Sequence, residues 1–243
     1  MSGTENTNDL PPGVRRAWGL PGRVPTRGPK ASLTLDAVVE AAVALGDAEG
    51  IDSISLTQVA SRLGVTTNAL YRYIDSRDEL HVLAREHALG PPTTGASASW
   101  QDGVEAWAVA LRARYAAHPW MVDLRVRLPV TPHALAWLEA LLAALEHGSF
   151  TTAETLRVAA LVDSYVRACA IAARDLAALE SPTPATASAV NTIAGLLAER
   201  GLDRVATAFG SGLYTEPADG TNDADFQYGL KRIVAGIEAL AAP

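Results

Sequence analysis

A tight turn between two short helical segments constrains this chain more than any other feature. Residues 55–63 and 66–73 both carry apolar side chains at the spacing of one buried helix face, and only two residues, beginning with Gly64, separate them. Ser55 and Gln58 have the spacing of a capping box. Glycine suits the turn because the residue there must adopt a left-handed backbone conformation or let the two helices approach closely. The pair predicts a helix-turn-helix.

The segment before this pair predicts a third, supporting helix. Its apolar residues recur at helical spacing from Leu35 to Leu45, Thr34 is the expected N-cap, and Gly50 ends the helix. Three helices of this kind are the minimum unit that can present a helix to the major groove of duplex DNA.

The rest of the chain also predicts helices. Alanine and leucine dominate its 243 residues, while three phenylalanines and few β-branched runs give strands little to build on. The fold class is therefore expected to be all-α. Two spacers rich in proline and small residues, 90–99 and 181–188, interrupt the pattern. Further helices are expected over 76–89, 100–117, 133–146, 151–179, 190–209 and 225–242.

Composition bounds the class of protein. Cys169 is the only cysteine, which excludes an internal disulfide and sites built from several thiolates. No apolar stretch has the length of a membrane span, and the polar start does not resemble a signal peptide. We expect a cytoplasmic protein with no membrane partner.

Charge is unevenly distributed along the chain. The formal net charge is -7, yet no acidic residue lies between Leu10 and Leu35. Proline and glycine break this stretch, so residues 1–30 are expected to form a flexible basic arm. The arm is either a solvated tail or a segment that touches phosphates or enters a minor groove. Its basic residues are Arg15, Arg16, Arg23, Arg27 and Lys30.

The outer face of segment 66–73 carries groups that suit DNA. With Leu70 and Ile74 turned inward, helical spacing leaves four polar residues outside. Asparagine can read adenine, a threonine methyl can contact thymine, and tyrosine and arginine commonly hold phosphates. A solvated polar face remains the alternative. The four residues are Thr67, Asn68, Tyr71 and Arg72.

The run from Gly64 to Leu80, GVTTNALYRYIDSRDEL, resembles the DNA-binding signature of the TetR family of bacterial repressors. The resemblance implies that Thr57, Thr67, Asn68 and Tyr71 lie near bases, and that Tyr71, Tyr73 and Arg77 contact phosphates. The arm, including Arg23, Arg27 and Lys30, resembles a basic arm found in a subset of the family.

The later chain resembles tetracycline repressors at residues 99–102 and 226–238. In that subgroup a histidine helps to bind a metal–drug complex, and Arg125 stands at that position here. Arginine cannot ligate a divalent metal, so we expect no metal and no cofactor. The expected domains are an arm over 1–30, a helix-turn-helix DNA-binding domain over 31–76, and a larger helical ligand-binding and dimerisation domain over 77–243.

Aromatic residues crowd the first half of the second domain and predict a cavity for a planar or hydrophobic effector. Tryptophans in helical bundles also serve as core, and Arg125 can instead pair with Asp123 or Glu139. The expected ligand-binding residues are His87, Trp107, Leu111, Trp120, Arg125, Trp137, Leu141 and Tyr165.

The expected function is ligand-responsive repression. Two subunits would pair through the Ala-rich helices 151–179 and 225–242 and bind a palindromic double-stranded operator as a homodimer. A small-molecule effector would shift helix 76–89 and release the DNA. The alternatives are the same fold acting without a ligand or as an activator, and an all-α enzyme. Against the enzyme, the chain has no HExxH, G-x-S-x-G or glycine-rich phosphate motif.

Overall fold

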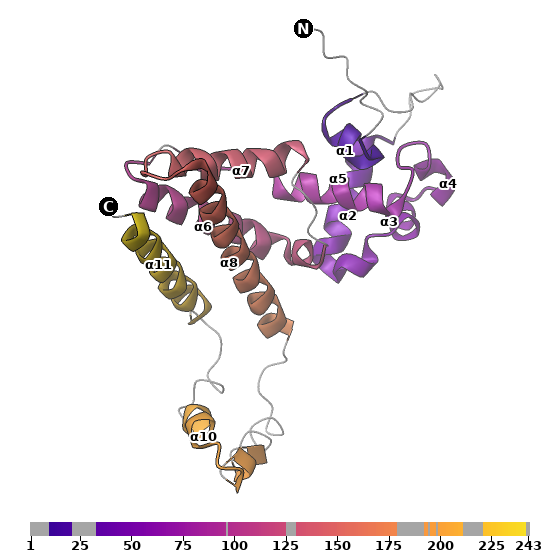
Figure 1. Ribbon diagram of the computed structural model, residues 1–243. Helices are drawn as coiled ribbons and strands as arrows, with labels where there is room; N and C mark the ends of the chain where they lie inside the picture. Colours follow the sequence, from indigo (N-terminus) through magenta and orange to yellow (C-terminus); the bar gives the residue numbers. More distant parts are fainter. Residues whose placement is uncertain are drawn as a thin grey trace. The chain divides into compact units, whose positions relative to one another are not determined.

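The computed structural model describes residues 10–20, 33–95, 97–124, 130–178, 192–193, 195–197, 199–210 and 221–241. Within these ranges the regular structure is entirely helical, which confirms the all-α class (Figure 1). None of their helices is long and apolar enough to cross a membrane. The α-helices are α1 (Pro12–Ala17), α2 (Leu35–Glu49), α3 (Leu56–Leu63), α4 (Thr67–Leu70), α5 (Arg77–Leu89), α6 (Trp100–Ala117), α7 (Pro132–Leu145), α8 (Thr152–Ala178), α10 (Asp203–Gly210) and α11 (Thr221–Ala241), and the 3-10 helices are η2 (Ile51–Ser53) and η3 (Pro119–Asp123).

The chain forms two compact units, Met1–Ile171 with Arg232–Pro243, and Ala172–Lys231. The second unit contains α10, in which the Thr207 hydroxyl donates to the Asp203 carbonyl at 2.8 Å. The residues predicted to contact DNA or a small molecule belong to the first unit.

Side-chain caps explain where the helices of the first unit begin. The hydroxyls of Thr34, Ser55, Thr66 and Ser76 each accept from a backbone N–H three residues later, at 3.1 to 3.3 Å. Each cap satisfies a donor that the first helical turn leaves unpaired. Thr34 and Ser55 are therefore confirmed as N-caps.

Gly64 ends α3 in the left-handed conformation, with φ 67° and ψ 29°, as the turn requires. Helix α4 is shorter than the predicted segment 66–73, because its α-helical hydrogen bonding stops at Leu70. The chain then turns, with the N–H groups of Tyr73 and Ile74 both donating to the Leu70 carbonyl, at 2.8 and 2.9 Å. This turn places Ile74 in the core, where it is fully buried.

The expectation of a flexible arm over residues 1–30 differs from the structure at residues 10–20. Pro12 opens α1, which packs beside α5 (Figure 1). Gly13 permits the approach, since a Cβ there would lie 3.0 Å from the Val82 Cβ. Val14 is buried, and Arg16 is ion-paired with α5. Arg23, Arg27 and Lys30 lie outside the described residues.

Candidate nucleic-acid interface and cavity

Helix α4 presents a polar face over a buried apolar one. Leu70 and Ile74 have no solvent exposure, which confirms the expected inward positions. Of the predicted DNA-contacting residues in and beside α4, Asn68, Tyr71 and Arg72 are exposed. On α3, Thr57 is exposed as well. The remaining predicted residues are the half-buried Thr67 and Tyr73 and the exposed Arg77.

Tyr73 uses its hydroxyl proton inside the protein. The Tyr73 Oη donates to the Leu33 carbonyl at 2.9 Å, joining the end of the α4 turn to the start of α2. While this bond is in place, the proton is not available to a phosphate oxygen. The structure thus gives Tyr73 an internal contact that the family resemblance did not predict.

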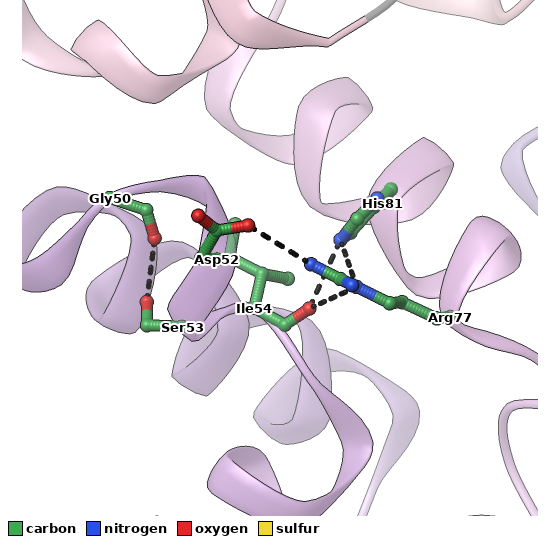
Figure 2. Close-up of polar contacts among 6 residues, drawn as sticks. All are labelled: Gly50, Asp52, Ser53, Ile54, Arg77 and His81. Atoms are coloured by element: carbon green, nitrogen blue, oxygen red, sulfur yellow. Dashed lines mark hydrogen bonds and ion pairs between the residues drawn. The ribbon is translucent and has the colours of Figure 1, made fainter.

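Arg77 also contacts the protein, where α5 meets η2 and the residue after it (Figure 2). Its Nε lies 3.3 Å from the Ile54 carbonyl and 3.3 Å from His81 Nε2, and one Nη lies 3.7 Å from Asp52 Oδ1. Half of the Arg77 side chain remains exposed. The guanidinium has five N–H donors, so a phosphate contact remains compatible with these bonds.

His81 occupies the same junction. Its Nε2 lies 3.0 Å from the Ile54 carbonyl and either donates to that oxygen or accepts from Arg77, depending on the tautomer. Burial lowers the pKa of His81, more than the hydrogen bond to Ile54 raises it. At neutral pH the ring is therefore uncharged.

The second candidate site is a cavity of about 290 Å³ bounded by α5, α6, α7 and α8. Four of the predicted ligand-binding residues line it: Trp107, Leu111, Trp137 and Leu141. The Trp107 indole donates to the Trp137 carbonyl at 2.7 Å, and the two rings meet edge to face with centroids 5.9 Å apart. These contacts hold two aromatic walls at a fixed angle.

Three other predicted residues do not line this cavity. Trp120 packs against α2, where a Cβ on Gly46 would lie 2.8 Å from its ring, and its indole donates to Asp47 Oδ1 at 2.7 Å. His87 is exposed on α5, and Tyr165 is half-buried on α8. Arg125 lies outside the described residues.

Sequence reasoning missed the polar residues of the cavity. These are Arg85 on α5 and Asp163 and Arg167 on α8. Asp163 ends a run of five apolar residues, 158–162, within a long helix, a signal that could have identified it. Burial raises the pKa of Asp163, and the positive charges of Arg85 and Arg167 oppose that rise.

Helix α5 belongs to both sites. Arg77, one of the predicted DNA-contacting residues, stands at its start, while Arg85 and Leu89 line the cavity near its end. The buried Glu86 fixes α5 to the start of α7, since its carboxylate accepts from the His133 N–H at 2.6 Å. Among the described residues no group of three His, Cys, Asp or Glu side chains is placed to hold a metal ion.

Comparisons with known proteins agree with this arrangement. Residues 38–82 match the model of bacterial regulatory proteins of the tetR family, and residues 91–241 match that of the tetracyclin repressor-like C-terminal domain. The HTH-type transcriptional repressor DrrR1 of Streptomyces coeruleorubidus is 31% identical, over 98% of this chain and 89% of that protein. The class E tetracycline repressor of Escherichia coli is 26% identical over 52% of this chain and 62% of its own length.

Solved structures show the same fold. ActR of Streptomyces coelicolor in complex with actinorhodin aligns with a TM-score of 0.70 and 25% identity, covering 87% of this chain and 98% of that one. Apo ActR aligns with a TM-score of 0.69 and 23% identity, covering 88% of this chain and all of that one. The chain therefore belongs to the TetR family of bacterial transcriptional regulators, as its signature run had indicated, with a helix-turn-helix domain followed by a tetracycline repressor-like C-terminal domain.

Proposed function

We propose that the protein is a dimeric repressor that holds a palindromic operator with α4 and releases it when a small aromatic or hydrophobic molecule enters the cavity. The observation that carries the proposal is the position of α5. This helix begins beside the face proposed to read DNA, formed by Asn68, Tyr71 and Arg72 and called the reading face below, and it ends at the cavity wall. The two ends of this helix lie roughly 18 Å apart, at about 1.5 Å per residue. A ligand that moves its cavity end moves the reading face too.

The contact between Glu86 and His133 supports this transmission. It joins α5 to α7, and α7 supplies Ala134, Trp137, Leu138 and Leu141 to the cavity. A molecule wedged against α7 therefore pushes on α5 through a buried carboxylate. Binding of the effector and of DNA is linked. If the effector lowers the affinity for DNA by some factor, bound DNA lowers the affinity for the effector by the same factor.

Dimer formation is proposed from the exposed apolar residues of α8. Leu161 and Leu176 are each about half exposed in the single chain, and neither lines the cavity. We infer that a partner subunit covers this exposed apolar surface. A second copy would cover them and bring a second α4 to the neighbouring half-site. Two such domains are needed because a single one contacts too few base pairs to be specific. The ActR complex with actinorhodin offers a relative whose structure holds a small molecule.

Sequencing the genomic DNA fragments that the purified protein captures tests the proposal. Wild-type protein should enrich a palindromic sequence and bind it with two chains per fragment. The double variant Asn68→Ala, Tyr71→Ala should lose the enrichment, whereas Arg204→Ala, which removes an exposed cation from α10, should keep it. Enrichment that survives the double variant, or binding by a single chain, would refute the proposed reading head.

A further inference from the structure

The cavity has one charged end, and its three charged residues differ in how they are held. Arg167 contacts backbone carbonyls, with its Nη2 donating to Leu124 at 3.0 Å and also to Val122. Its position is therefore fixed by η3 and the residue after it. Arg85 is half-buried, and no hydrogen bond or close ion pair joins it to another of the described residues.

Asp163 only partly balances this charge. It interacts electrostatically with Arg85 and Arg167, but neither guanidinium lies within ion-pair distance of its carboxylate. Asp163 is an exposed residue in the single chain. Enough protein nevertheless surrounds its carboxyl group for desolvation to raise its pKa. Two arginines against one acid leave this end of the cavity positive.

The other walls are flat and apolar. Trp107, Tyr115 and Trp137 provide aromatic surfaces, and leucines and alanines from four helices complete the lining. A half-buried guanidinium on such a wall gains most from an oxygen anion, because each charge-assisted hydrogen bond formed away from water is about twice as strong as a neutral one.

We propose that the effector is a planar aromatic molecule bearing a carboxylate or another oxygen anion, and that Arg85 is the residue that recognises this group. The inference rests on the proposed function and names the ligand class for the same cavity. A volume of about 290 Å³ favours a compact acid of a few rings over a long-chain lipid.

Two probes of similar shape, one anionic and one neutral, test the ligand class. Anthraquinone-2-carboxylate and anthraquinone-2-carboxamide are titrated into the full-length protein at pH 7.5, and binding is followed by quenching of tryptophan fluorescence. The carboxylate should bind about tenfold more tightly than the carboxamide. Equal affinities, tighter binding of the carboxamide, or no binding of either probe would overturn the proposal.

Variants assign the preference to Arg85. Arg85→Met should abolish it by weakening only the carboxylate, and unchanged carboxamide affinity shows that the cavity is intact. Arg85→Lys keeps the charge and should retain most of the preference. Arg204→Met, at an exposed α10 residue outside the cavity lining, should retain all of it. A preference that survives Arg85→Met contradicts the assignment.

Operator release separates the two proposals. If both probes bind with equal affinity and both release DNA, the ligand class is wrong while the proposed function stands. If the carboxylate binds with the expected preference but the operator stays bound, the ligand class is supported and ligand-driven release is contradicted.

Discussion

Arg16 Nε lies 2.6 Å from Glu79 Oε1, and the Glu79 side chain is only 1% exposed. The other carboxylate oxygen accepts from the Asp75 N–H, also at 2.6 Å. Glu79 stands in the first turn of α5, and Arg16 belongs to α1. This ion pair therefore makes part of the N-terminal segment a structural component of the helix-turn-helix domain.

Replacing Arg16 with methionine should destabilise the protein. The buried carboxylate of Glu79 would lose its cationic partner, at a cost of about 3 kcal/mol. Chemical denaturation at fixed protein concentration measures the free energy of unfolding. Arg62→Met removes the same charge from an exposed position on α3 and should change stability by less than about 0.5 kcal/mol. Equal stability of the two variants would show that the ion pair contributes nothing.

Local features of the sequence predicted much of the helix-turn-helix. Gly64 marks its turn, Ser55 and Thr34 mark helix starts, and Leu70 and Ile74 mark the inward face, because caps, turns and periodicity act over a few residues.

Contacts between distant segments were not predictable in this way. From the sequence, Arg16 is one of several basic residues on an expected flexible arm. Its ion pair with Glu79 forms only when the fold places α5 beside α1. From the sequence, Trp120 was expected in the cavity. In the structure its ring packs against Gly46 and its indole donates to Asp47. In the cavity itself, aromatic crowding indicated Trp107 and Trp137, but the fold that brings Arg85 of α5 and Asp163 of α8 to one cavity has no short-range signal.

Acidification should weaken the junction that contains His81. Because burial lowers the pKa of His81 in the folded protein, the unfolded chain takes up the proton at higher pH. The contribution of His81 to the free energy of unfolding is fully present above its ordinary pKa of about 6.5. It is lost as the pH falls from there towards the lower pKa of the folded protein. Asp52 and Asp78 oppose this effect and Arg77 reinforces it.

Denaturation of wild type and His81→Gln at pH 7.5 and pH 5.5 checks this expectation. The wild type should lose more stability than the variant between the two pH values, and groups common to both proteins cancel in the comparison. An equal loss in the two proteins would contradict it.

Trp120→Phe should lower stability without changing binding in the cavity. The substitution removes the hydrogen bond to Asp47 and part of a buried ring, at a cost of about 1–3 kcal/mol. Affinity for anthraquinone-2-carboxylate should stay within about twofold. Trp107→Phe also breaks a buried indole bond, but it alters the cavity lining and should change the affinity. A larger affinity change in Trp120→Phe than in Trp107→Phe contradicts the placement of Trp120.

Tyr73→Phe should act on stability more than on DNA affinity. Its hydroxyl proton is used by the Leu33 carbonyl, and losing this bond costs about 1 kcal/mol. Gel-shift affinity for the captured fragment should remain within about threefold of wild type, corrected for the folded fraction. A large loss of affinity with unchanged stability would instead assign the hydroxyl to a phosphate.

Fluorescence anisotropy of the captured, labelled DNA fragment tests the central claim most directly. Asn68→Ala with Tyr71→Ala removes two exposed groups from the outer face of the α4 region and should weaken binding at least about tenfold, since each base contact contributes roughly 1–3 kcal/mol. The Arg204→Ala control should bind like wild type. Unchanged affinity in the folded double variant would mean that this face does not read DNA.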